Sequence, residues 1–439
     1  LILQLKRKNY KMKRLNIAIV GLGNIGSYLF NYLNKNKRIL SKKNNCIPNI
    51  LFVSAKNKKR KRKIKIKKKL WLKNYLDATK DKNVDLIIEL IGGSEGAAKK
   101  LVFNALKNKK HVVTANKALI AKYGDKLAEI AEKNKVNLEF EAAVCGGVPI
   151  IRSIKEGLIA NKINKIFGIF NGTSNYILSS MDKQNKDFDE VLNNAKNLGY
   201  AESKPSADLN GDDVAAKLKI LTSLCFNSYL NNNIHVEGIK EIDKTDINNA
   251  NKLGYKIKLL GYSERINNKI YQRVHPALIK KSSYVASIDG VLNAVIVDGK
   301  PVGKNIIQGE GAGPAATTSA LVSDISSILR GNIKFPFSIS NKERKRLKFE
   351  NISKRSFSAY LRFEVLDKSG VLSNITNIFS KNNVSIKRLI QNPNKNKKIS
   401  SIIIITHNSK DSSLNKILKI IGKKIYVKKK PKLIRIDDN

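Results

Sequence analysis

Acidic residues are scarce in this chain, which has 35 Asp and Glu against 84 Lys and Arg and a formal net charge of +49. The first 76 residues contain no acid, and residues 56–70 hold eleven Lys or Arg. Such a charge predicts either a polyanionic partner or a compositional bias. Because the basic residues are spread over the whole chain, we favour the bias and expect neither a specific nucleic acid nor a membrane as partner.

Cysteine and histidine are also rare, with three and four residues that lie far apart. Their spacing excludes a disulfide framework and a zinc site, and it favours a reducing compartment, the cytoplasm. No apolar run approaches the roughly 20 residues that span a bilayer, and the opening LILQL is too short for a signal peptide. Residues 1–11 precede Met12, and we expect them to be an extension without function.

A glycine-rich turn follows the first apolar run, Leu15–Val20, and precedes a helical pattern. Strand, GxGxxG turn and helix in this order predict a dinucleotide-binding fold, although a purely structural turn is the alternative. The first glycine permits the tight turn, the second lets a pyrophosphate approach, and the third lets helix pack on strand. We expect the phosphates to lie on this turn and on the start of the helix: Gly21, Gly23, Asn24, Ile25 and Gly26.

The second strand, Ile50–Ser54, is followed by Lys56 and the basic run instead of an acid. An acid at this place binds the ribose 2′-hydroxyl of NAD, whereas cations favour the 2′-phosphate of NADP. The sequence therefore predicts NADP(H) as the preferred cofactor, with NAD(H) possible. A solvated basic loop is an alternative interpretation that is compatible with the first.

Two later strands, Val84–Leu90 and His111–Thr114, end in polar or glycine-rich loops. Alternating strands and helices predict a doubly wound parallel sheet, in which ligands bind at the carboxyl edge. We therefore expect the loop residues to contact the cofactor: Gly92, Gly93, Ser94 and Lys117.

An acidic cluster with a lysine occupies residues 199–217, which is unusual in so basic a chain. Gly211-Asp212-Asp213 is typical of a helix start, with acids at the positive helix terminus. Asp213 and Lys217 are four residues apart and share one helix face. An ordinary helix salt bridge explains this spacing, and a catalytic pair is the alternative.

Several motifs in order along residues 15–330 resemble the homoserine dehydrogenase family. That family interconverts L-homoserine and L-aspartate 4-semialdehyde with NAD(P), in the biosynthesis of threonine, methionine and isoleucine. The resemblance implies a second, α+β domain for substrate and dimerisation, and a homodimer or homotetramer. Its motifs are GLGNIG, Thr114–Lys117, Glu141–Ile151, Asn171–Leu178, the acidic cluster, Glu237–Ile239, Leu253–Leu260, Val274–Ile279 and Gly309–Ile325.

The resemblance also implies roles for individual residues. Lys217 would be the acid/base group, with Lys117 beside the substrate hydroxyl, and burial plus a second ammonium would lower the pKa of Lys217. An exposed loop lysine is the alternative for Lys117. Substrate contacts would come from Glu202, Asp208, Asp213 and Thr173, and a further cofactor contact from Gly311.

A monovalent cation, Na+, is implied on backbone carbonyls of the turn that follows the last strand of the first domain. Its ligands would be the carbonyls of Glu141, Val144, Gly146 and Val148, a donor set that suits a hard cation. The alternative is that the glycines only turn the chain. Two residues depart from the family pattern: Lys204 stands where an Asp is usual, and Cys145, for which we expect a buried inert thiol, replaces a small residue.

The C-terminal part resembles an ACT domain, because Asp367–Ile375 carries its loop motif and a ferredoxin-like βαββαβ order is expected, ending in a strand at Lys424–Lys428. Threonine would be the effector, and a ligand-free tethering module is the alternative. We expect each part to fold alone. The expected divisions are residues 12–148 (completed by 305–330), 149–304, a linker at 331–354, and 355–439.

Two other functions remain open at this point. One is another Rossmann oxidoreductase of aspartate-derived metabolites, and the other is a basic nucleic-acid-associated protein on a degenerate enzyme fold. The acidic cluster argues against the first, and the full set of matched motifs argues against the second.

Overall fold

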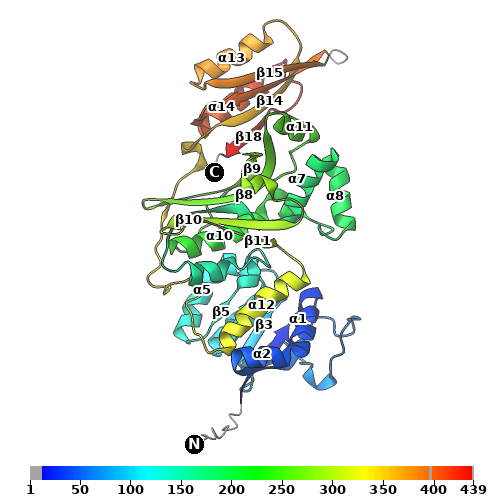
Figure 1. Ribbon diagram of the computed structural model, residues 1–439, viewed down its shortest axis with the longest axis vertical. Coiled ribbons are helices and arrows are strands. Elements are labelled where there is room, and N and C mark those ends of the chain that lie inside the picture. Colours follow the sequence, from blue (N-terminus) through cyan, green and yellow to red (C-terminus); the bar gives the residue numbers. More distant parts are fainter. Residues whose placement is uncertain (1–11, 395–397, 438–439) are drawn as a thin grey trace, which may run out of the picture.

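The computed structural model describes residues 12–394 and 398–437. The expected N-terminal extension, residues 1–11, lies outside the described residues. Three parts are stacked along the long axis, with the N-terminal domain at one end and the C-terminal domain at the other (Figure 1). Among the described residues, no helix combines the length and the apolar character that a membrane crossing requires.

The first sheet is parallel and has the strand order β2-β1-β3-β4-β5. Side chains of β1 alternate between two cores: Ala18 and Val20 belong to one, Ile17 and Ile19 to the other. A sheet buried on both faces needs such a continuous apolar run, and the expected doubly wound fold is confirmed. Its strands are β1 (Lys13–Val20), β2 (Cys46–Ser54), β3 (Leu86–Glu89), β4 (His111–Thr114) and β5 (Leu138–Glu139).

Helices cover both faces of this sheet. The core around Ile17 includes α1 (Asn24–Lys35), α2 (Lys37–Asn44) and α12 (Pro314–Leu329), and the core around Val20 includes α4 (Ala97–Lys107) and α5 (Lys117–Lys133). Helix α12 comes from far along the chain and packs on α1, as Figure 1 shows in yellow against blue. Of residues 305–330, only this helix joins the first domain, because residues 303–310 form a strand of the second sheet.

The second sheet is mixed and runs through the middle and C-terminal parts, in the order β11-β10-β6-β8-β9-β18-β14-β16-β15. Strands β8 and β9 form a long antiparallel pair, and β18 pairs with β9 in parallel. The C-terminal domain is therefore joined to the middle domain through the sheet itself. The strands of the middle domain are β6 (Lys162–Ile169), β7 (His235–Val236), β8 (Tyr255–Ile266), β9 (Lys269–Lys280), β10 (Leu292–Lys300) and β11 (Gly303–Glu310).

Helices of the middle domain pack on one face of this sheet, and their apolar residues join the core that extends from the first domain. Capping side chains fix two of the helix starts: Asn171 accepts a bond from the Ser174 amide, and Asp243 forms a capping box with Asp246. These helices are α6 (Ile150–Arg152), α7 (Gly172–Gln184), α8 (Phe188–Asn197), α9 (Ser206–Asn210), α10 (Asp212–Phe226) and α11 (Lys244–Lys252).

The C-terminal domain has the expected βαββαβ order, but the predicted position of its last strand is wrong. Residues 424–428 are not a strand of the sheet, and Ile425 is 93% exposed. The short apolar run at residues 425–427 is typical of a strand, whereas Ile434 and Ile436 are the buried residues. The elements are β14 (Ala359–Leu366), α13 (Val371–Lys381), β15 (Ile386–Asn394), β16 (Ile399–Thr406), α14 (Asp411–Gly422) and β18 (Lys432–Asp437).

Residues 331–354, expected to be a linker, pack against the other parts. Phe337 and Arg344 are buried, and β12 (Lys348–Phe349) pairs with β9. The segment therefore adds to the core of the middle domain. The remaining short elements are α3 (Asp77–Lys80), β13 (Ser356–Phe357) and β17 (Ser409–Lys410).

Candidate active site

The glycine turn between β1 and α1 has the geometry that its sequence predicts. Gly21 has φ +107°, and a Cβ there would lie 2.3 Å from the Leu90 carbonyl oxygen. A Cβ on Gly26 would lie 2.0 Å from the Gly21 oxygen, so strand and helix approach too closely for any side chain. Nothing lies within 4 Å of a Cβ on Gly23. No acidic side chain occupies the first turn of α1, which begins at Asn24 and Ile25, so its amide groups suit an anion.

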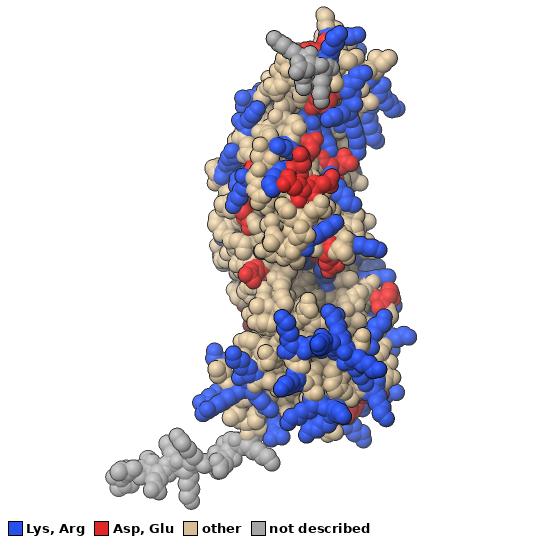
Figure 2. Space-filling view, turned by 90° about the vertical axis from the view of Figure 1, so that its right-hand side faces the viewer, with Lys and Arg blue, Asp and Glu red and all other residues tan. Residues whose placement is uncertain are grey.

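Basic residues follow β2, and one of them contacts this turn. Lys56 is exposed just beyond the end of β2. Arg62 folds back and donates from Nε to the Leu22 carbonyl oxygen at 3.0 Å, with its guanidinium 5.5 Å from the centre of the Trp71 ring. Figure 2 shows Lys and Arg side chains gathered over this domain. Sequence reasoning treated the run as a whole and missed the position of Arg62.

A buried glutamate joins the loops that follow β3 and β4. The Glu89 carboxylate accepts the amides of Ile91 and Gly92 at 2.8 and 3.0 Å and the Thr114 hydroxyl at 2.5 Å. Gly92 and Gly93 have positive φ, and open space lies beside both. Ser94 is partly exposed in the same loop. Sequence reasoning missed Glu89, although an acid at the end of an apolar strand was a visible signal.

An ion pair network crosses the boundary between the first two domains. Asp213, near the start of α10, lies 2.7 Å from Lys117 Nζ through Oδ1 and 2.8 Å from Lys217 Nζ through Oδ2. Lys217 also donates to the Phe170 carbonyl oxygen at 2.6 Å. Asp213 and Lys217 are buried, whereas the Lys117 side chain is 43% exposed. Lys117 begins α5, so each domain contributes one ammonium to the same carboxylate.

The expected low pKa of Lys217 is wrong for this arrangement. Burial disfavours its charge, but the adjacent Asp213 carboxylate outweighs burial and raises the pKa of Lys217 above its usual value. Burial likewise opposes the charge of Asp213, and the two lysines together hold its pKa well below the usual range. The centre therefore contains a carboxylate between two ammonium groups.

Asn171 connects this centre to a second carboxylate. Its Nδ2 donates to Asp208 Oδ1 at 2.7 Å and to Asp213 Oδ2 at 2.8 Å. Burial, followed by the charge of Asp213, raises the pKa of Asp208. Thr173, the second residue of α7, donates to the Tyr200 carbonyl oxygen at 2.7 Å. Asn171 was part of a matched motif, but its role as a bridge was missed.

One site candidate, Glu202, and one departure from the family pattern, Lys204, lie on the surface. Glu202 and Lys204 are exposed, and Glu202 has no hydrogen bond or ion pair within residues 12–394 and 398–437. The structure thus brings together Lys117, Asp208, Asp213 and Lys217, with Thr173 on the adjoining helix, and leaves Glu202 outside this group.

The turn after β5 lies against the start of α12. A Cβ on Gly146 would lie 2.7 Å from the Gly311 carbonyl oxygen, and a Cβ on Gly311 would lie 2.2 Å from the Asn293 side chain. Cys145 is buried with φ +53°, and burial raises the pKa of its thiol, as an inert thiol requires.

The four carbonyls expected to hold a cation differ in their partners. The Glu141 oxygen accepts the Val144 amide at 3.3 Å, and the Val148 oxygen accepts the Ile150 amide at 2.7 Å. The oxygens of Val144 and Gly146 accept no hydrogen bond from any described residue, and so fit a hard cation. In the described part of the chain, no three His, Cys, Asp or Glu side chains form a metal-binding group.

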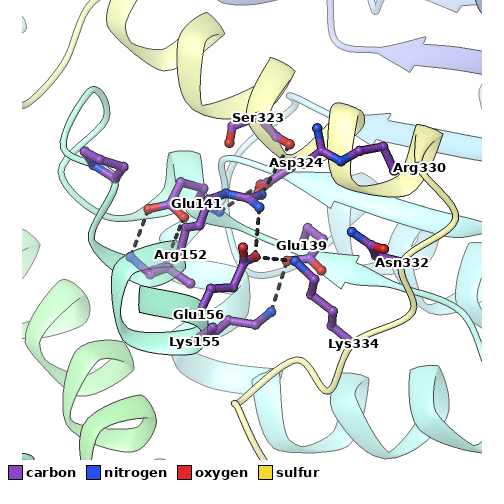
Figure 3. A network of polar contacts seen from close by, with 12 residues as sticks. Glu139, Glu141, Arg152, Lys155, Glu156, Ser323, Asp324, Arg330, Asn332 and Lys334 are labelled. Atoms are coloured by element: carbon purple, nitrogen blue, oxygen red, sulfur yellow. Dashed lines mark hydrogen bonds and ion pairs between the residues drawn. The ribbon is translucent and has the colours of Figure 1, made fainter. Parts of the chain in front are cut away.

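A buried polar network holds this turn in place (Figure 3). The Glu141 carboxylate accepts the amides of Ile151 and Arg152 at 2.9 and 2.7 Å, and its own amide donates to Asp324 Oδ2 at 2.9 Å. Burial raises the pKa of Glu141 to about 7. Nearby, Glu139 and Lys155 form a buried ion pair at 3.0 Å.

Comparison with known proteins gives matches over almost the whole chain. Three family models match: "Homoserine dehydrogenase, NAD binding domain" at residues 21–141, "Homoserine dehydrogenase" at residues 149–326, and "ACT domain" at residues 359–425. A homoserine dehydrogenase of Neisseria gonorrhoeae is 37% identical over 97% of this chain and 99% of its own length, and that of Bacillus subtilis is 34% identical over 98% and 99%. A solved homoserine dehydrogenase from Thiobacillus denitrificans has a TM-score of 0.89 and 35% identity over 97% and 99%.

Proposed function

This chain belongs to the homoserine dehydrogenase family, and we propose that it interconverts L-homoserine and L-aspartate 4-semialdehyde with NADP(H) in the biosynthesis of threonine, methionine and isoleucine. It is an NAD(P)-dependent oxidoreductase that acts on a CH–OH group. The observation that carries the proposed reaction is the Lys117–Asp213–Lys217 network, which lies at the carboxyl edge of the parallel sheet in the first domain.

Lys217 is the proposed acid/base group. Because Asp213 keeps it protonated, its Nζ can donate a proton to the aldehyde oxygen during reduction. The nicotinamide supplies the hydride when bound. In the reverse direction the same nitrogen must first lose a proton, which separation from Asp213 or a nearby substrate ammonium favours. Lys117, which is half-exposed on the same carboxylate, is proposed to lie beside the hydroxyl.

Asp208 and Asp213 are the proposed ligands of the substrate ammonium. Asn171 bridges both carboxylates, so a substrate ammonium between them would take the place of this neutral amide and pair with two negative charges. Thr173 is proposed as a neighbouring polar contact. Glu202, which lies exposed on a loop, stays a predicted substrate contact.

The preference for NADP(H) rests on the residues that follow β2. Lys56 and Arg62 offer cations where a 2′-phosphate would lie, and no acid is available there for a 2′-hydroxyl. The glycines of the β1, β3 and α12 turns and Ser94 are proposed to line the rest of the cofactor. Na+ is proposed on the turn from Glu141 to Val148, where it would order the backbone beside Gly311.

We keep threonine as the proposed effector of the ACT domain, a homodimer or homotetramer as the proposed assembly, and the cytoplasm as the proposed compartment. The effector proposal is supported by the loop before α13, where Gly370 has φ +82° and the first turn of the helix carries neither a capping side chain nor an acid.

A spectrophotometric assay tests the proposal. Purified chain is incubated with L-homoserine and either NADP or NAD, with and without threonine and with Na+ or a bulky organic cation. We expect homoserine-dependent reduction at 340 nm that is faster at low NADP than at low NAD. Equal kcat/KM for the two cofactors would remove the NADP preference, and no turnover with either would remove the substrate assignment.

A further inference from the structure

A short segment of the middle domain, Glu237–Ile239, lies between the C-terminal domain and the proposed substrate site. Its preceding strand, β7, pairs with β9, and the Glu237 amide donates to the Val274 carbonyl oxygen at 2.7 Å. On one side it meets Arg435 of β18, and on the other it meets the turn between α9 and α10.

On the side of the C-terminal domain, one arginine binds the segment. Arg435 donates through one terminal nitrogen to both carboxylate oxygens of Glu237, each at 2.9 Å. Its Nε donates to Asp411, the first residue of α14, at 2.7 Å. The Arg435 side chain is 2% exposed. His235 adds a contact to Glu237 at 2.6 Å. A buried guanidinium with fixed partners on both sides is a rigid connection.

On the substrate side, the segment is in backbone contact with α9. The Ile239 amide donates to the Leu209 carbonyl oxygen at 2.8 Å, directly after Asp208. A Cβ on Gly238 would lie 2.1 Å from that same oxygen, so no side chain larger than hydrogen fits between the two. The position of the segment therefore limits the position of Asp208 and of Gly211, the residue that precedes α10.

We propose that Glu237 and Arg435 are positioning residues for homoserine: Arg435 fixes Glu237, and the Glu237–Ile239 segment fixes the α9–α10 turn that presents Asp208 and Asp213. This inference rests on the proposed substrate role of those two aspartates. Loss of the ion pair leaves the cofactor turn untouched, but it loosens the carboxylates that bind the substrate. A displacement of about 1 Å at such a site is large in kinetic terms.

The test is steady-state kinetics of the full-length chain with NADP. We expect Glu237→Gln and Arg435→Met to raise the KM for homoserine about tenfold, with the KM for NADP and kcat changed less than about threefold. Arg435→Lys keeps the positive charge, so it should raise the KM for homoserine less than Arg435→Met does. A general loss of stability would instead lower the fraction of active enzyme and leave both KM values unchanged.

Arg362 provides the matched control. It is also a buried arginine of the C-terminal domain, and it pairs with Asp243 and Asp246 at the start of α11. Arg362→Met should destabilise the same domain junction but leave the KM for homoserine within about twofold of the parent. An equal rise of KM in Arg362→Met would overturn the inference, because any weakening of the junction would then suffice.

Asp208→Asn separates this inference from the function on which it rests. If Asp208→Asn raises the KM for homoserine and Glu237→Gln does not, the positioning role is wrong and the substrate site stands. If Asp208→Asn also leaves that KM unchanged, the proposed substrate site is wrong and the positioning role falls with it.

Discussion

The middle domain meets its two neighbours through buried charges, but the two junctions are built differently. At the junction with the C-terminal domain, the upper junction in Figure 1, the buried cations are arginines: Arg273, Arg362 and Arg435 pair with Asp437, Asp246 and Glu237. At the junction with the first domain, the lower junction in Figure 1, the central cations are lysines, and Lys117 and Lys217 share Asp213. Arginine stays charged at any ordinary pH, whereas lysine can exchange a proton when its surroundings change.

The pKa values of the carboxylates also differ between the two junctions. Next to arginine, the pKa of Glu237 is lowered to about 2, against the effect of burial, by the His235 bond and the Arg435 charge. Asp246 is an exception there, since burial raises its pKa, and Asp213 is an exception at the junction with the first domain, since Lys117 and Lys217 hold its pKa well below the usual range. At the lower junction, burial raises the pKa of Glu141 to about 7 and that of Asp324 well above its usual value. The upper junction is therefore a fixed electrostatic frame, and the proposed proton transfer belongs to the lower one.

The largest effect should come from the lysine at the centre of the lower junction. Lys217→Ala removes the proposed proton donor, and loss of one acid/base group costs ~10²–10⁴ in rate. Cofactor binding should survive, because the glycine turn is untouched. The measurement is kcat with homoserine and NADP, alongside a fluorescence titration with NADPH. Lys219→Ala, on the same helix, is the control, and turnover of Lys217→Ala within threefold of the parent would contradict the assignment.

The next largest effect concerns stability: the unfolding free energy should depend on the buried ion pair between Glu139 and Lys155 at the lower junction. Lys155→Met leaves Glu139 buried without its partner, which should cost about 3–5 kcal/mol of unfolding free energy. Adding Glu139→Leu should restore most of that loss, since an apolar pair has no charge to desolvate. Urea unfolding measures both variants. Lys126→Met breaks an exposed pair with Glu129 and should cost under about 1 kcal/mol; equal costs would show that burial is unimportant here.

A third change lies outside both junctions and should spare the substrate. Lys56→Ala removes a cation near the expected 2′-phosphate, so the KM for NADP should rise about three- to tenfold while those for NAD and homoserine stay constant. Initial rates at varied NADP and NAD give the comparison, with Lys59→Ala as the control in the same loop. A parallel rise for NAD would mean that Lys56 does not distinguish the two cofactors.

The sequence predicted the first domain well because its signals are local. The order of strand, Gly21–Gly26 and helix is short, and steric limits at Gly21 and Gly26 permit few alternatives. The pairing of Asp213 with Lys217 was also local, at four residues. Glu89 and Arg62 were missed because their partners, Thr114 and Leu22, are set by the fold and not by spacing.

The upper junction could not be predicted from the sequence for the same reason. Arg435 and Glu237 are 198 residues apart, and no periodicity relates β18 to β9. The sequence therefore suggested a linker and an independent tail, whereas Phe337 and Arg344 are buried and the sheet is continuous. The wrong position of the last strand made this harder, because Lys424–Lys428 would have carried no arginine to the junction.

The smallest expected effect concerns the pH response of the upper junction. The folded pKa of Glu237 is lowered from 4.5 to about 2, so its ionised form stabilises the fold fully above pH 4.5. That contribution is lost as the pH falls from about 4.5 to about 2. Because the Glu237 side chain is 37% exposed, solvent screening reduces the contribution to about 1 kcal/mol.

Glu237→Gln removes the titrating group, so its unfolding free energy should fall below that of the parent at pH 6 and approach it at pH 3. Urea unfolding at the two pH values measures the difference, and Glu129→Gln, at an exposed pair, is the control that should follow the parent at both. A constant gap between parent and Glu237→Gln would mean that the Glu237 charge does not stabilise the junction. The frame formed by Arg435 would then act through shape and hydrogen bonding alone, and the contrast between the two junctions would lose its electrostatic basis.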